Sequence, residues 1–524
     1  MVDLNTFRAP ENYNIADEID KHFSNKLALK WENEDGLYNE ITYAELIKEA
    51  NKLANGLTKL GMKKGDKVLI MTPRLIESYV IYLACLKAGI VIIPASELLR
   101  AKDIAYRLQH AEAAAVISYY EFCEEFHHIK EELPHLRYKI AFGGEVSEWL
   151  QMEKIAELEA EEFHTVETSK EDIAFLPYTS GTTGQPKGVV HSHGWGYAHL
   201  RIASEQWLNI GKSDTVWATA APGWQKWVWS PFLSILGTGA TGFVYSGKFQ
   251  PHKYLTMLEK HQMNVLCCTP TEYRMMAKMD GLHKFALSNL HSAVSAGEAL
   301  NGEVIDVFKQ YFNVQIRDGY GQTESTLLIG TLKGMESKVG SMGKPILEDF
   351  IEIVDDEGKP VSVGEVGNIA IHKDLPALFN RYYKDKDRTV KSFQGDYFLT
   401  GDRASKDEDN YFWFQGRSDD VIISSGYTIG PFEVEDALMK HAAVKECAVV
   451  ASPDAVRGNV VKAVIILKDG TEGSEALVKE LQQFVKKLTA PYKYPRIIEF
   501  VDSLPKTDSG KIRRVELRNE AAVK

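Results

Sequence analysis

The sequence predicts an α/β protein with a large N-terminal body and a small α+β C-terminal domain, and three observations carry this prediction. From about Lys67 to Gly340, short β-like runs alternate with longer helix-like segments, which is typical of parallel sheets layered with helices. From Asp349, apolar and polar residues alternate on both sides of an Asp-Asp-Glu-Gly turn, which predicts an antiparallel hairpin. Beyond Asp419, strand-like and helix-like runs form a unit of about a hundred residues.

The overall composition fits a soluble multidomain protein. A chain of 524 residues exceeds what one hydrophobic core usually supports, so two or more domains are expected. Its 44% hydrophobic and 26% charged residues are ordinary for a globular protein. The net charge of −12 argues against a general nucleic-acid or membrane-surface binder, so an anionic ligand would be held by local donors.

The N-terminal body contains the elements expected of layered sheets. The runs "KVLIM", "IVII", "AAVIS", "VLCCTP" and "SAVSAG" predict strands. Residues 80–94 are the most apolar stretch, but Lys87 and Gly89 interrupt it and it is too short to span a bilayer. This stretch is predicted to be a buried helix, a cap at Gly89 and a buried strand, so no stable membrane insertion is expected.

The C-terminal part is predicted to fold as its own domain, with the boundary and hinge at Asp419. This boundary divides the chain into residues 1–418 and 419–524. In the second part, the strands "KECAVVAS" and "VVKAVIIL" precede a helix that Ser474 would cap. The apolar face of that helix is predicted to contain Leu477, Leu481, Phe484 and Leu488.

Cysteine usage and the N-terminal residues predict the compartment. The first twenty residues contain no basic region followed by an apolar run, so no signal peptide is expected. The cysteines are odd in number and form no CxxC motif, which favours a reducing, cytoplasmic setting over a disulfide framework. They are Cys85, Cys123, Cys267, Cys268 and Cys447.

The stretch "YTSGTTGQPKGVVH" has the composition of a loop that holds a polyphosphate. Glycines let backbone N–H groups approach a ligand, hydroxyls add donors, and Lys187 adds a positive charge. A Walker A loop is disfavoured because Pro186 precedes Lys187 and no Ser or Thr follows it. Both flanks read as strands, so the loop is predicted to join a hairpin; a Gly/Thr-rich surface turn is the alternative. The predicted phosphate-binding residues are Thr179, Ser180, Gly181, Thr182, Thr183, Gly184, Gln185, Pro186 and Lys187.

Four further strings follow this loop in order. They are "DGYGQTES" (residues 318–325), "LTGDR" (399–403), "GRSDDVIISSGY" (416–427) and "PKTDSGKIRR" (505–514). With the loop, they make the chain resemble the adenylate-forming (ANL) superfamily from about Glu32 to Arg514. The strings "SPDAVRGNVVKA" and "TAPYKYPRIIEFVDSLPKT" are most similar to the medium-chain acyl-CoA synthetases of that superfamily.

The resemblance implies a fold and a reaction. The ANL fold has an N-terminal adenylation domain of several subdomains, one of them β-barrel-like, and a small mobile C-terminal domain. The reaction is that of an AMP-forming carboxylate–CoA ligase, an acid–thiol ligase. A small carboxylic acid and ATP, with Mg²⁺, give an acyl-adenylate and pyrophosphate, and coenzyme A then captures the acyl group.

The resemblance also implies roles at the nucleotide site. Thr323 would donate to the α-phosphate, and Glu324 is an oxygen ligand suited to Mg²⁺. Asp402 could accept both ribose hydroxyls, with Arg417 on the other side of the sugar. The remaining expected nucleotide contacts are Glu298, Asp318, Gly319, Tyr320, Gly321 and Gln322. An acidic turn after a strand is the structural alternative for residues 323–324.

Lys511 is the expected catalytic cation of the first step. Negative charge builds on the α-phosphate as the carboxylate attacks, and a preorganised cation lowers that barrier. In isolation the "GKIRR" run would be a solvated basic tail. The superfamily makes room for the thiol by rotating its small domain, here about Asp419.

Coenzyme A contacts follow from the same resemblance. The expected residues are Ser425, Gly426, Tyr427, Arg457, Lys486, Tyr494, Pro495 and Arg496. One departure concerns Thr428, which stands where the medium-chain relatives commonly carry arginine.

The acyl pocket is expected to accept more than acetate. Acetyl-specific relatives place a tryptophan immediately before "QTE", where this chain has Gly321. Trp224 and Gly297 would line the pocket, while Trp227 and Trp229 are predicted to fill the core. Short- to medium-chain fatty acids, including branched ones, are the expected substrates, and benzoate-like acids are an alternative.

Three other readings stay open at this point. The chain could load a carrier-protein thiol, or it could be a silent nucleotide- or acyl-binding regulator. A luciferase-like oxygenase fits the fold alone. His191 and His193 are predicted to be structural rather than metal ligands, because no carboxylate or cysteine accompanies them at a suitable spacing. The sequence leaves a homodimer open.

Overall fold

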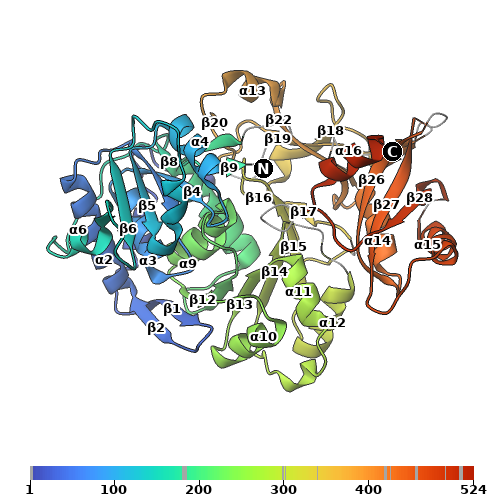
Figure 1. Cartoon of the computed structure of the whole chain (residues 1–524), viewed down its shortest axis with the longest axis horizontal. Coiled ribbons are helices and arrows are strands. Elements are labelled where there is room, and N and C mark those ends of the chain that lie inside the picture. The colour runs from blue at the N-terminus through green and yellow to red at the C-terminus, as the bar shows by residue number, and fades with distance from the viewer. Residues whose placement is uncertain are drawn as a thin grey trace. The chain divides into compact units, whose positions relative to one another are not determined.

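The structure is a computed structural model whose described residues are 4–179, 186–297, 300, 302–338, 340–417, 420, 422–424, 427–454, 458–489, 491–506 and 512–523. The chain forms two compact units (Figure 1). The first contains Met1–Phe350 and Lys373–Phe393, and the second contains Ile351–His372 and Gln394–Lys524. The boundary predicted between residues 418 and 419 falls inside the second unit, on residues outside the described ranges, and stays a prediction.

One large sheet of the first unit runs in the order β17-β16-β15-β14-β13-β11-β12-β1-β2. Its six central strands are parallel, and antiparallel strands close both edges. The bounds are β1 (Leu27–Asn33), β2 (Tyr38–Thr42), β11 (Thr215–Ala218), β12 (Thr241–Ser246), β13 (Val265–Cys268), β14 (Ser292–Ala296), β15 (Ile316–Gly321), β16 (Leu327–Gly330) and β17 (Lys344–Pro345).

The second sheet of this unit runs in the order β20-β10-β8-β4-β3-β5-β6-β7, and β9 pairs with β10. The strands from β8 to β7 are parallel, whereas β10 is antiparallel to β8, β9 and β20. The bounds are β3 (Lys67–Met71), β4 (Val91–Ala95), β5 (Ala115–Tyr119), β6 (Tyr138–Phe142), β7 (Leu150–Gln151), β8 (Ile173–Phe175), β9 (Tyr178–Thr179), β10 (Lys187–Ser192) and β20 (Arg381–Tyr382).

Helices connect these strands, as the alternating pattern predicts. Helix α2 begins at a capping box, in which Thr42 and Glu45 bond to each other's backbone N–H groups. The helices of this unit are α1 (Asp17–Asp20), α2 (Tyr43–Lys59), α3 (Ile76–Lys87), α4 (Ala101–Ala111), α5 (Glu124–His127), α6 (Met152–Ala156), α7 (His193–His199), α8 (Gln225–Trp227), α9 (Ile235–Thr238), α10 (Pro251–Lys260), α11 (Pro270–Ala277), α12 (Gly302–Phe312) and α13 (Lys386–Lys391).

The apolar stretch at residues 80–94 forms the predicted helix, cap and strand. Helix α3 is buried along nearly its whole surface, Gly89 has a φ of +65°, and β4 follows. Among the described residues, no helix is long and apolar enough to cross a membrane.

The second unit contains three smaller sheets. Strands β18 (Ile351–Val354), β19 (Gly367–His372), β22 (Tyr397–Lys406) and β21 (Phe393–Gln394) form an antiparallel sheet, with β23 (Phe412–Arg417) on β22. The hairpin predicted after Asp349 is thus confirmed as β18 and β19. The other sheets are β24 (Ile422–Ser424) with β25 (Tyr427–Ile429), and β26 (Val444–Asp454), β27 (Gly458–Leu467) and β28 (Ile497–Phe500).

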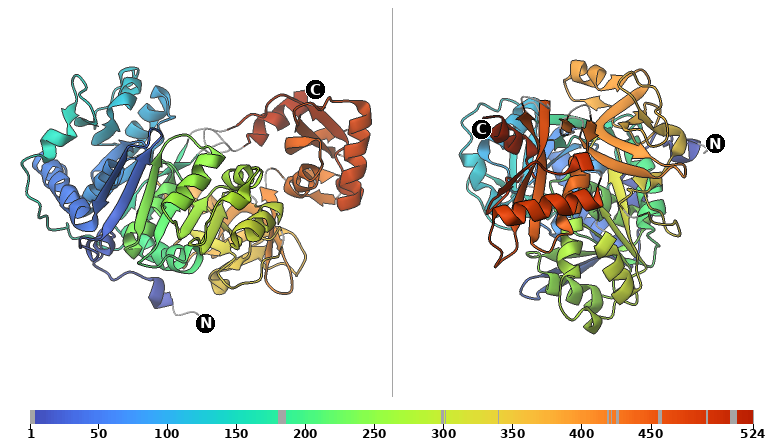
Figure 2. Two further views of the ribbon diagram at one scale, coloured as in Figure 1. Left: turned by 90° about the horizontal axis from the view of Figure 1, so that it is seen from below. Right: turned by 90° about the vertical axis from the view of Figure 1, so that its right-hand side faces the viewer.

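Helices cover both faces of the last sheet (Figure 2). On one face, Val449, Ala463 and Ile465 pack with α14 (Pro431–Met439) and α15 (Glu475–Leu488); on the other, Val450 and Val464 pack with α16 (Arg514–Val523). Ser474 caps α15 as predicted.

The predicted apolar face of α15 is wrong at its C-terminal end. Leu477 and Leu481 are buried, but Val485 occupies the next core position and Leu488 is 51% exposed. Leu488 is the last residue of the helix, so its side chain lies beyond the core that the sheet provides.

Candidate active site

The predicted phosphate loop connects a hairpin, as the flanking sequence indicates. Strands β9 and β10 pair in antiparallel register, with Lys187 opposite Thr179. Tyr106 donates its hydroxyl to the carbonyl oxygen of Pro186 at 2.9 Å. The buried Thr179 Oγ1 has no hydrogen-bond partner among the described residues, which is the condition expected of a donor awaiting a ligand. Ser180 to Gln185 lie outside the described residues.

A second hairpin carries the "DGYGQTES" string. Strand β15 ends at Gly321, a turn follows, and β16 returns antiparallel from Leu327. The turn is fixed by Ser325, whose backbone N–H donates to the carbonyl oxygen of Gln322 at 3.0 Å. Because β14 and β15 are parallel, Gly297 at the end of β14 lies at the same sheet edge as this hairpin.

Lys187 and Glu324, from the two hairpins, form an ion pair. Lys187 Nζ lies 2.8 Å from Glu324 Oε1. The Glu324 side chain is 8% exposed and that of Lys187 is 23% exposed. Tyr382 of β20 bonds to both: Lys187 Nζ donates to its hydroxyl at 2.9 Å, and the hydroxyl donates to Glu324 Oε1 at 2.8 Å. The structure therefore brings together the predicted phosphate cation and the predicted metal ligand.

Asp318 lies at the same edge, next to Gly319 and Tyr320 on β15. Burial raises the pKa of its carboxyl to about 8, although the backbone N–H groups of Gly319 and Leu300 partly offset this effect. Asp318 therefore holds its proton at neutral pH. The predicted contact Glu298 lies outside the described residues.

An aromatic column, defined as His191, Trp195 and His199, supports the turn from behind. These residues are spaced by four along the end of β10 and α7, so they stack on one face: ring centroids are 4.4 Å apart for His191 and Trp195, and 5.2 Å for Trp195 and His199. His191 Nε2 lies 2.6 Å from the Thr323 carbonyl oxygen, and Trp195 Nε1 donates to the Ser325 carbonyl oxygen at 3.0 Å. His199 Nδ1 lies 2.6 Å from the hydroxyl of Thr326.

The two histidines of the column are buried and neutral. Burial lowers the pKa of His191 to about 4, although the bond to the Thr323 carbonyl oxygen partly opposes this shift. Burial lowers the pKa of His199 to about 3. His193 is buried as well, and no cluster of three metal-binding side chains occurs in the described part of the chain. The structural roles expected of His191 and His193 stay a prediction.

The acyl pocket is expected beside β15, which contains Gly321. Trp207 Nε1 donates to the Asp318 carbonyl oxygen at 3.0 Å, and a Cβ added at Gly319 would lie only 2.5 Å from the Trp207 ring. Lys226 Nζ lies 5.0 Å from the centroid of that ring. A Cβ added at Gly321 would lie 2.2 Å from the Thr326 carbonyl oxygen, whereas at Gly297 it would meet no atom within 4 Å.

The tryptophans at positions 224, 227 and 229 differ in how deeply they are buried. Trp224 is half-buried at the start of α8. Trp227 and Trp229 are 2% and 8% exposed, which confirms the prediction that both fill the core.

Within the second unit, Asp402 and Arg417 face each other across β22 and β23. They are register partners, and Arg417 Nη1 lies 3.1 Å from Asp402 Oδ1. Asp402 is buried and Arg417 is exposed, so the pair presents a carboxylate and a guanidinium side by side.

The predicted coenzyme A residues of the second unit gather around one tyrosine. Lys486 Nζ lies 3.9 Å, and the Arg496 guanidinium 4.8 Å, from the centroid of the Tyr494 ring. Arg496 Nη1 also donates to the Tyr494 hydroxyl at 2.6 Å, and Pro495 between them is buried. An aromatic face beside two cations suits a nucleotide with phosphates. Tyr427 lies on β25, and Ser425, Gly426, Arg457, Lys511 and Asp419 lie outside the described residues.

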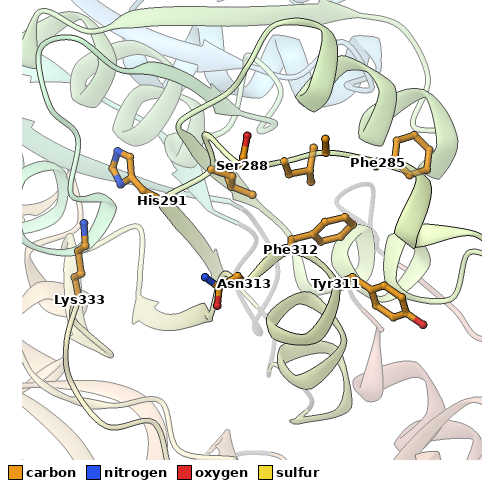
Figure 3. Close-up of a pocket in the computed structure, with 10 residues that line it drawn as sticks. Phe285, Ser288, His291, Tyr311, Phe312, Asn313 and Lys333 are labelled. Carbon is orange, nitrogen blue, oxygen red and sulfur yellow. The ribbon is translucent and has the colours of Figure 1, made fainter.

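A separate pocket lies away from these residues in the part of the chain that the structure describes. It has a volume of about 620 Å³ and is lined by His291, Tyr311 and Asn313, which precede β14 or β15, and by Lys333, which follows the antiparallel β16 (Figure 3). The nucleotide-site residues follow the same two parallel strands, so the pocket lies at the opposite edge of the sheet. In open α/β sheets ligands bind at the carboxyl ends of strands, and the residues expected to bind the nucleotide lie at that edge.

Tyr382, Trp207 and Lys226 are residues that the sequence analysis missed. Each lies outside the recognised strings, and each reaches the site through tertiary contacts. Of these three residues, only Lys226 could have been suspected from the sequence, because it stands within the tryptophan-rich stretch that follows Trp224.

Comparison with known proteins agrees with this geometry. Residues 16–383 match the AMP-binding enzyme family, and residues 433–511 match the AMP-binding enzyme C-terminal domain. An uncharacterized acyl–CoA ligase of Bacillus subtilis is 57% identical over 97% of this chain and 96% of its own length. The mitochondrial acyl-coenzyme A synthetase ACSM3 of Rattus norvegicus is 38% identical over 98% of this chain and 91% of its own length.

A solved structure supports the same assignment. The anthranilate CoA ligase AuaEII, crystallised with anthranoyl-AMP, superimposes with a TM-score of 0.90 at 31% identity and covers 98% of both chains. The chain therefore belongs to the AMP-binding enzyme family of the ANL superfamily, among the AMP-forming acyl-CoA synthetases, which are acid–thiol ligases.

Proposed function

We propose that the chain activates a short- to medium-chain fatty acid, branched acids included, to an acyl-adenylate and then transfers the acyl group to coenzyme A. The observation that carries the proposal is the Lys187–Glu324 pair, 2.8 Å apart, at the edge where two motif-bearing hairpins meet. A cation beside a carboxylate suits a triphosphate that arrives with a divalent metal ion.

The donor set fits Mg²⁺ held jointly with ATP. Mg²⁺ in nucleotide sites is usually bound by one or two protein carboxylates together with phosphates and waters, and Glu324 supplies one carboxylate. When bound, the ion would neutralise charge on the phosphate oxygens. Both bonds that Glu324 makes to described side chains go to Oε1, so Oε2 remains for the metal.

Several residues of the chain would each have a separate role in adenylation, the first step. Lys187 and the loop of residues 179–187 would hold the phosphates that leave as pyrophosphate, and Thr323 would donate to the α-phosphate. Asp402 and Arg417 would hold the ribose. Lys511 would stabilise the charge that develops as the acyl carboxylate attacks.

The second step would use the cluster around Tyr494. Lys486 and Arg496 would bind phosphates of coenzyme A, and Tyr494 offers a stacking face. A rotation of residues 419–524 about Asp419 would move Lys511 away and admit the thiol.

Three alternatives keep a place beside this proposal. An aryl acid is one, because the anthranilate ligase named above shares the fold over nearly the whole chain. Loading of a carrier-protein thiol is the second, and a silent binder is the third. The cluster at Lys486, Tyr494 and Arg496 favours free coenzyme A.

The location and assembly are separate proposals. We place the enzyme in the cytoplasm, because every cysteine is a buried free thiol, and we keep a homodimer as its assembly. Cell fractionation and sedimentation velocity test these two points.

A substrate panel tests the function. ATP, Mg²⁺ and coenzyme A are supplied with acids from acetate to decanoate, branched short acids and benzoate, and both AMP and thioester are measured. Thioester and AMP are expected together for acids larger than acetate. Adenylate without thioester would point to a carrier protein, preferred turnover of benzoate to an aryl ligase, and no turnover to a silent binder.

A further inference from the structure

Tyr382 is the third corner of a closed hydrogen-bonded triangle in the candidate site. Its hydroxyl lies 2.9 Å from Lys187 Nζ and 2.8 Å from Glu324 Oε1, and the latter two atoms are 2.8 Å apart. Tyr382 is 3% exposed. A phenol has one proton to donate and lone pairs that accept, so it satisfies the ammonium and the carboxylate at once.

The backbone around Tyr382 joins the two hairpins that carry the site. Strand β20 pairs with β10, where Tyr382 is the register partner of Val189. Tyr383 N–H donates to the Gly188 carbonyl oxygen at 2.8 Å. Three residues before Tyr382, Phe379 N–H donates to the carbonyl oxygen of Glu324 itself at 2.7 Å. The segment 379–383 is therefore bonded through its main chain to Glu324 itself and to Gly188, the residue that follows Lys187.

Strand alternation places the Tyr382 side chain on the correct face. Lys187 and Val189 are two residues apart on β10, so their side chains point to the same face, and Tyr382 opposite Val189 shares it. Lys187 Nζ lies 4.5 Å from the centroid of the Tyr382 ring. The Phe379 ring packs against the same tyrosine with centroids 4.8 Å apart. The phenol is thus held by packing, and its position does not depend on the ion pair.

This arrangement answers a difficulty in the proposed reaction. Lys187 and Glu324 are bonded directly to each other, yet one must turn to the phosphates and the other to the metal ion. A carboxylate that lost Lys187 without another partner would have to reorient. The Tyr382 hydroxyl would keep its bond to Oε1 and so leave the opposite oxygen, Oε2, to hold a metal ion.

We infer that Tyr382 is a positioning residue for adenylation, which presets the Glu324 carboxylate for the metal and the Lys187 ammonium for the phosphates. This inference rests on the proposed function. It assigns to Tyr382 no contact with the reacting atoms.

The test compares Tyr382→Phe with Tyr383→Phe. Each substitution removes one hydroxyl, but Tyr383 lies on the other face of the strand, where its ring packs on His110 at 5.7 Å. Two quantities are measured in the full chain. One is the affinity for Mn²⁺ with a non-hydrolysable ATP analogue, by electron paramagnetic resonance. The other is the rate of each half-reaction, with pyrophosphate release for the first and capture of a preformed adenylate by coenzyme A for the second.

Tyr382→Phe is expected to weaken Mn²⁺ binding and adenylate formation by about 10- to 100-fold, the usual loss when a partner of a metal ligand is removed. Capture of preformed adenylate should stay within about threefold of the unsubstituted chain, and Tyr383→Phe should resemble that chain in both assays. A higher concentration of Mn²⁺ or Mg²⁺ should restore part of the adenylation rate.

Two results would overturn the inference. One is unchanged Mn²⁺ affinity in Tyr382→Phe; the other is an equal loss in both half-reactions with a lowered melting temperature, which would mark a purely structural role. If the unsubstituted chain makes no adenylate from any acid while Tyr382→Phe still loses Mn²⁺ affinity, the proposed function is wrong and the assignment of Tyr382 stands.

Discussion

At the scale of single residues, burial decides what the histidines near the site can do. His191 is fully buried and its pKa is lowered to about 4, so it is a neutral donor to the Thr323 carbonyl oxygen. The His191 imidazole has a pKa of about 4 in the fold and the usual pKa of 6.5 in the unfolded chain. Between pH 4 and pH 6.5, unfolding therefore takes up a proton. The stabilisation is therefore complete above pH 6.5 and is lost as the pH falls toward 4.

His191→Gln tests this direction of the pH dependence of stability, because glutamine keeps an N–H donor but does not titrate. Between about pH 6 and 4.5, the slope of unfolding free energy against pH should fall by one proton, or about 1.4 kcal/mol per pH unit. Urea unfolding followed by tryptophan fluorescence measures the slope. His283→Gln, at an exposed position, is the control, and equal slopes in the two variants would contradict the burial of a neutral His191.

At the scale of elements, the aromatic column shows how β10 and α7 support the turn of residues 322–326. The turn of residues 322–326 has few main-chain bonds of its own, and the column holds it at Thr323, Ser325 and Thr326. Two π-helical segments, η3 (Leu200–Leu208) and η4 (Val228–Ser234), follow in the same region and are joined by a hydrogen bond of 2.7 Å between Ser204 and Ser234. Such irregular helices are frequent at functional sites.

Trp195→Phe removes the bond to the Ser325 carbonyl oxygen and leaves an aromatic ring in the column. The expected loss is about 1–3 kcal/mol, the cost of an unsatisfied buried group, seen in the melting temperature and as a several-fold lower kcat/KM for ATP in pyrophosphate exchange. Trp149→Phe is the matched control, because the buried Trp149 Nε1 has no hydrogen-bond partner within the described ranges. Equal losses in both variants would mean that the effect comes from the reduced side-chain volume and not from the lost hydrogen bond.

Sequence patterns predicted those elements whose signal is local. Strand composition on both sides of the glycine loop predicted the β9–β10 hairpin, and Gly89 marked the end of α3. Strand β20 has only two residues, and its pairing with β10 joins positions nearly two hundred residues apart. No periodicity can appear in so short a strand, so Tyr382 could be found only from the fold. The prediction that Leu488 lies on the apolar face was wrong for a related reason, because a helical pattern does not show where the facing sheet ends.

At the scale of the whole molecule, the two proposed half-reactions require different groups at the same position of the site: Lys511 in the first and the thiol of coenzyme A in the second. The proposed order is that Lys511 serves adenylation and is withdrawn before coenzyme A enters. Family membership supports the chemistry, and the movement itself stays a prediction.

Lys511→Ala should separate the two steps. Removing one preorganised cation from a developing charge costs about 10²- to 10³-fold, so pyrophosphate release should fall by that factor. Thioester formation from preformed acyl-adenylate should change by less than about threefold. Rapid-quench assays of each step provide the measurement, with Lys506→Ala as the control, because Lys506 pairs with Glu446 at the surface. A parallel loss in both steps would remove Lys511 from the first step.

The path of the chain between the units has a consequence for synthesis. The first unit is interrupted after Phe350, and residues 373–393 return to it with β20 and Tyr382. A nascent chain that has emerged only to Phe350 has both motif hairpins but lacks the strand that clamps them together. We expect a ribosome-bound chain of this length to bind nucleotide weakly, and binding to rise once Tyr382 has left the exit tunnel. Adenylate formation would still await Lys511 in the C-terminal domain, so nucleotide binding would come before catalysis in the order of synthesis.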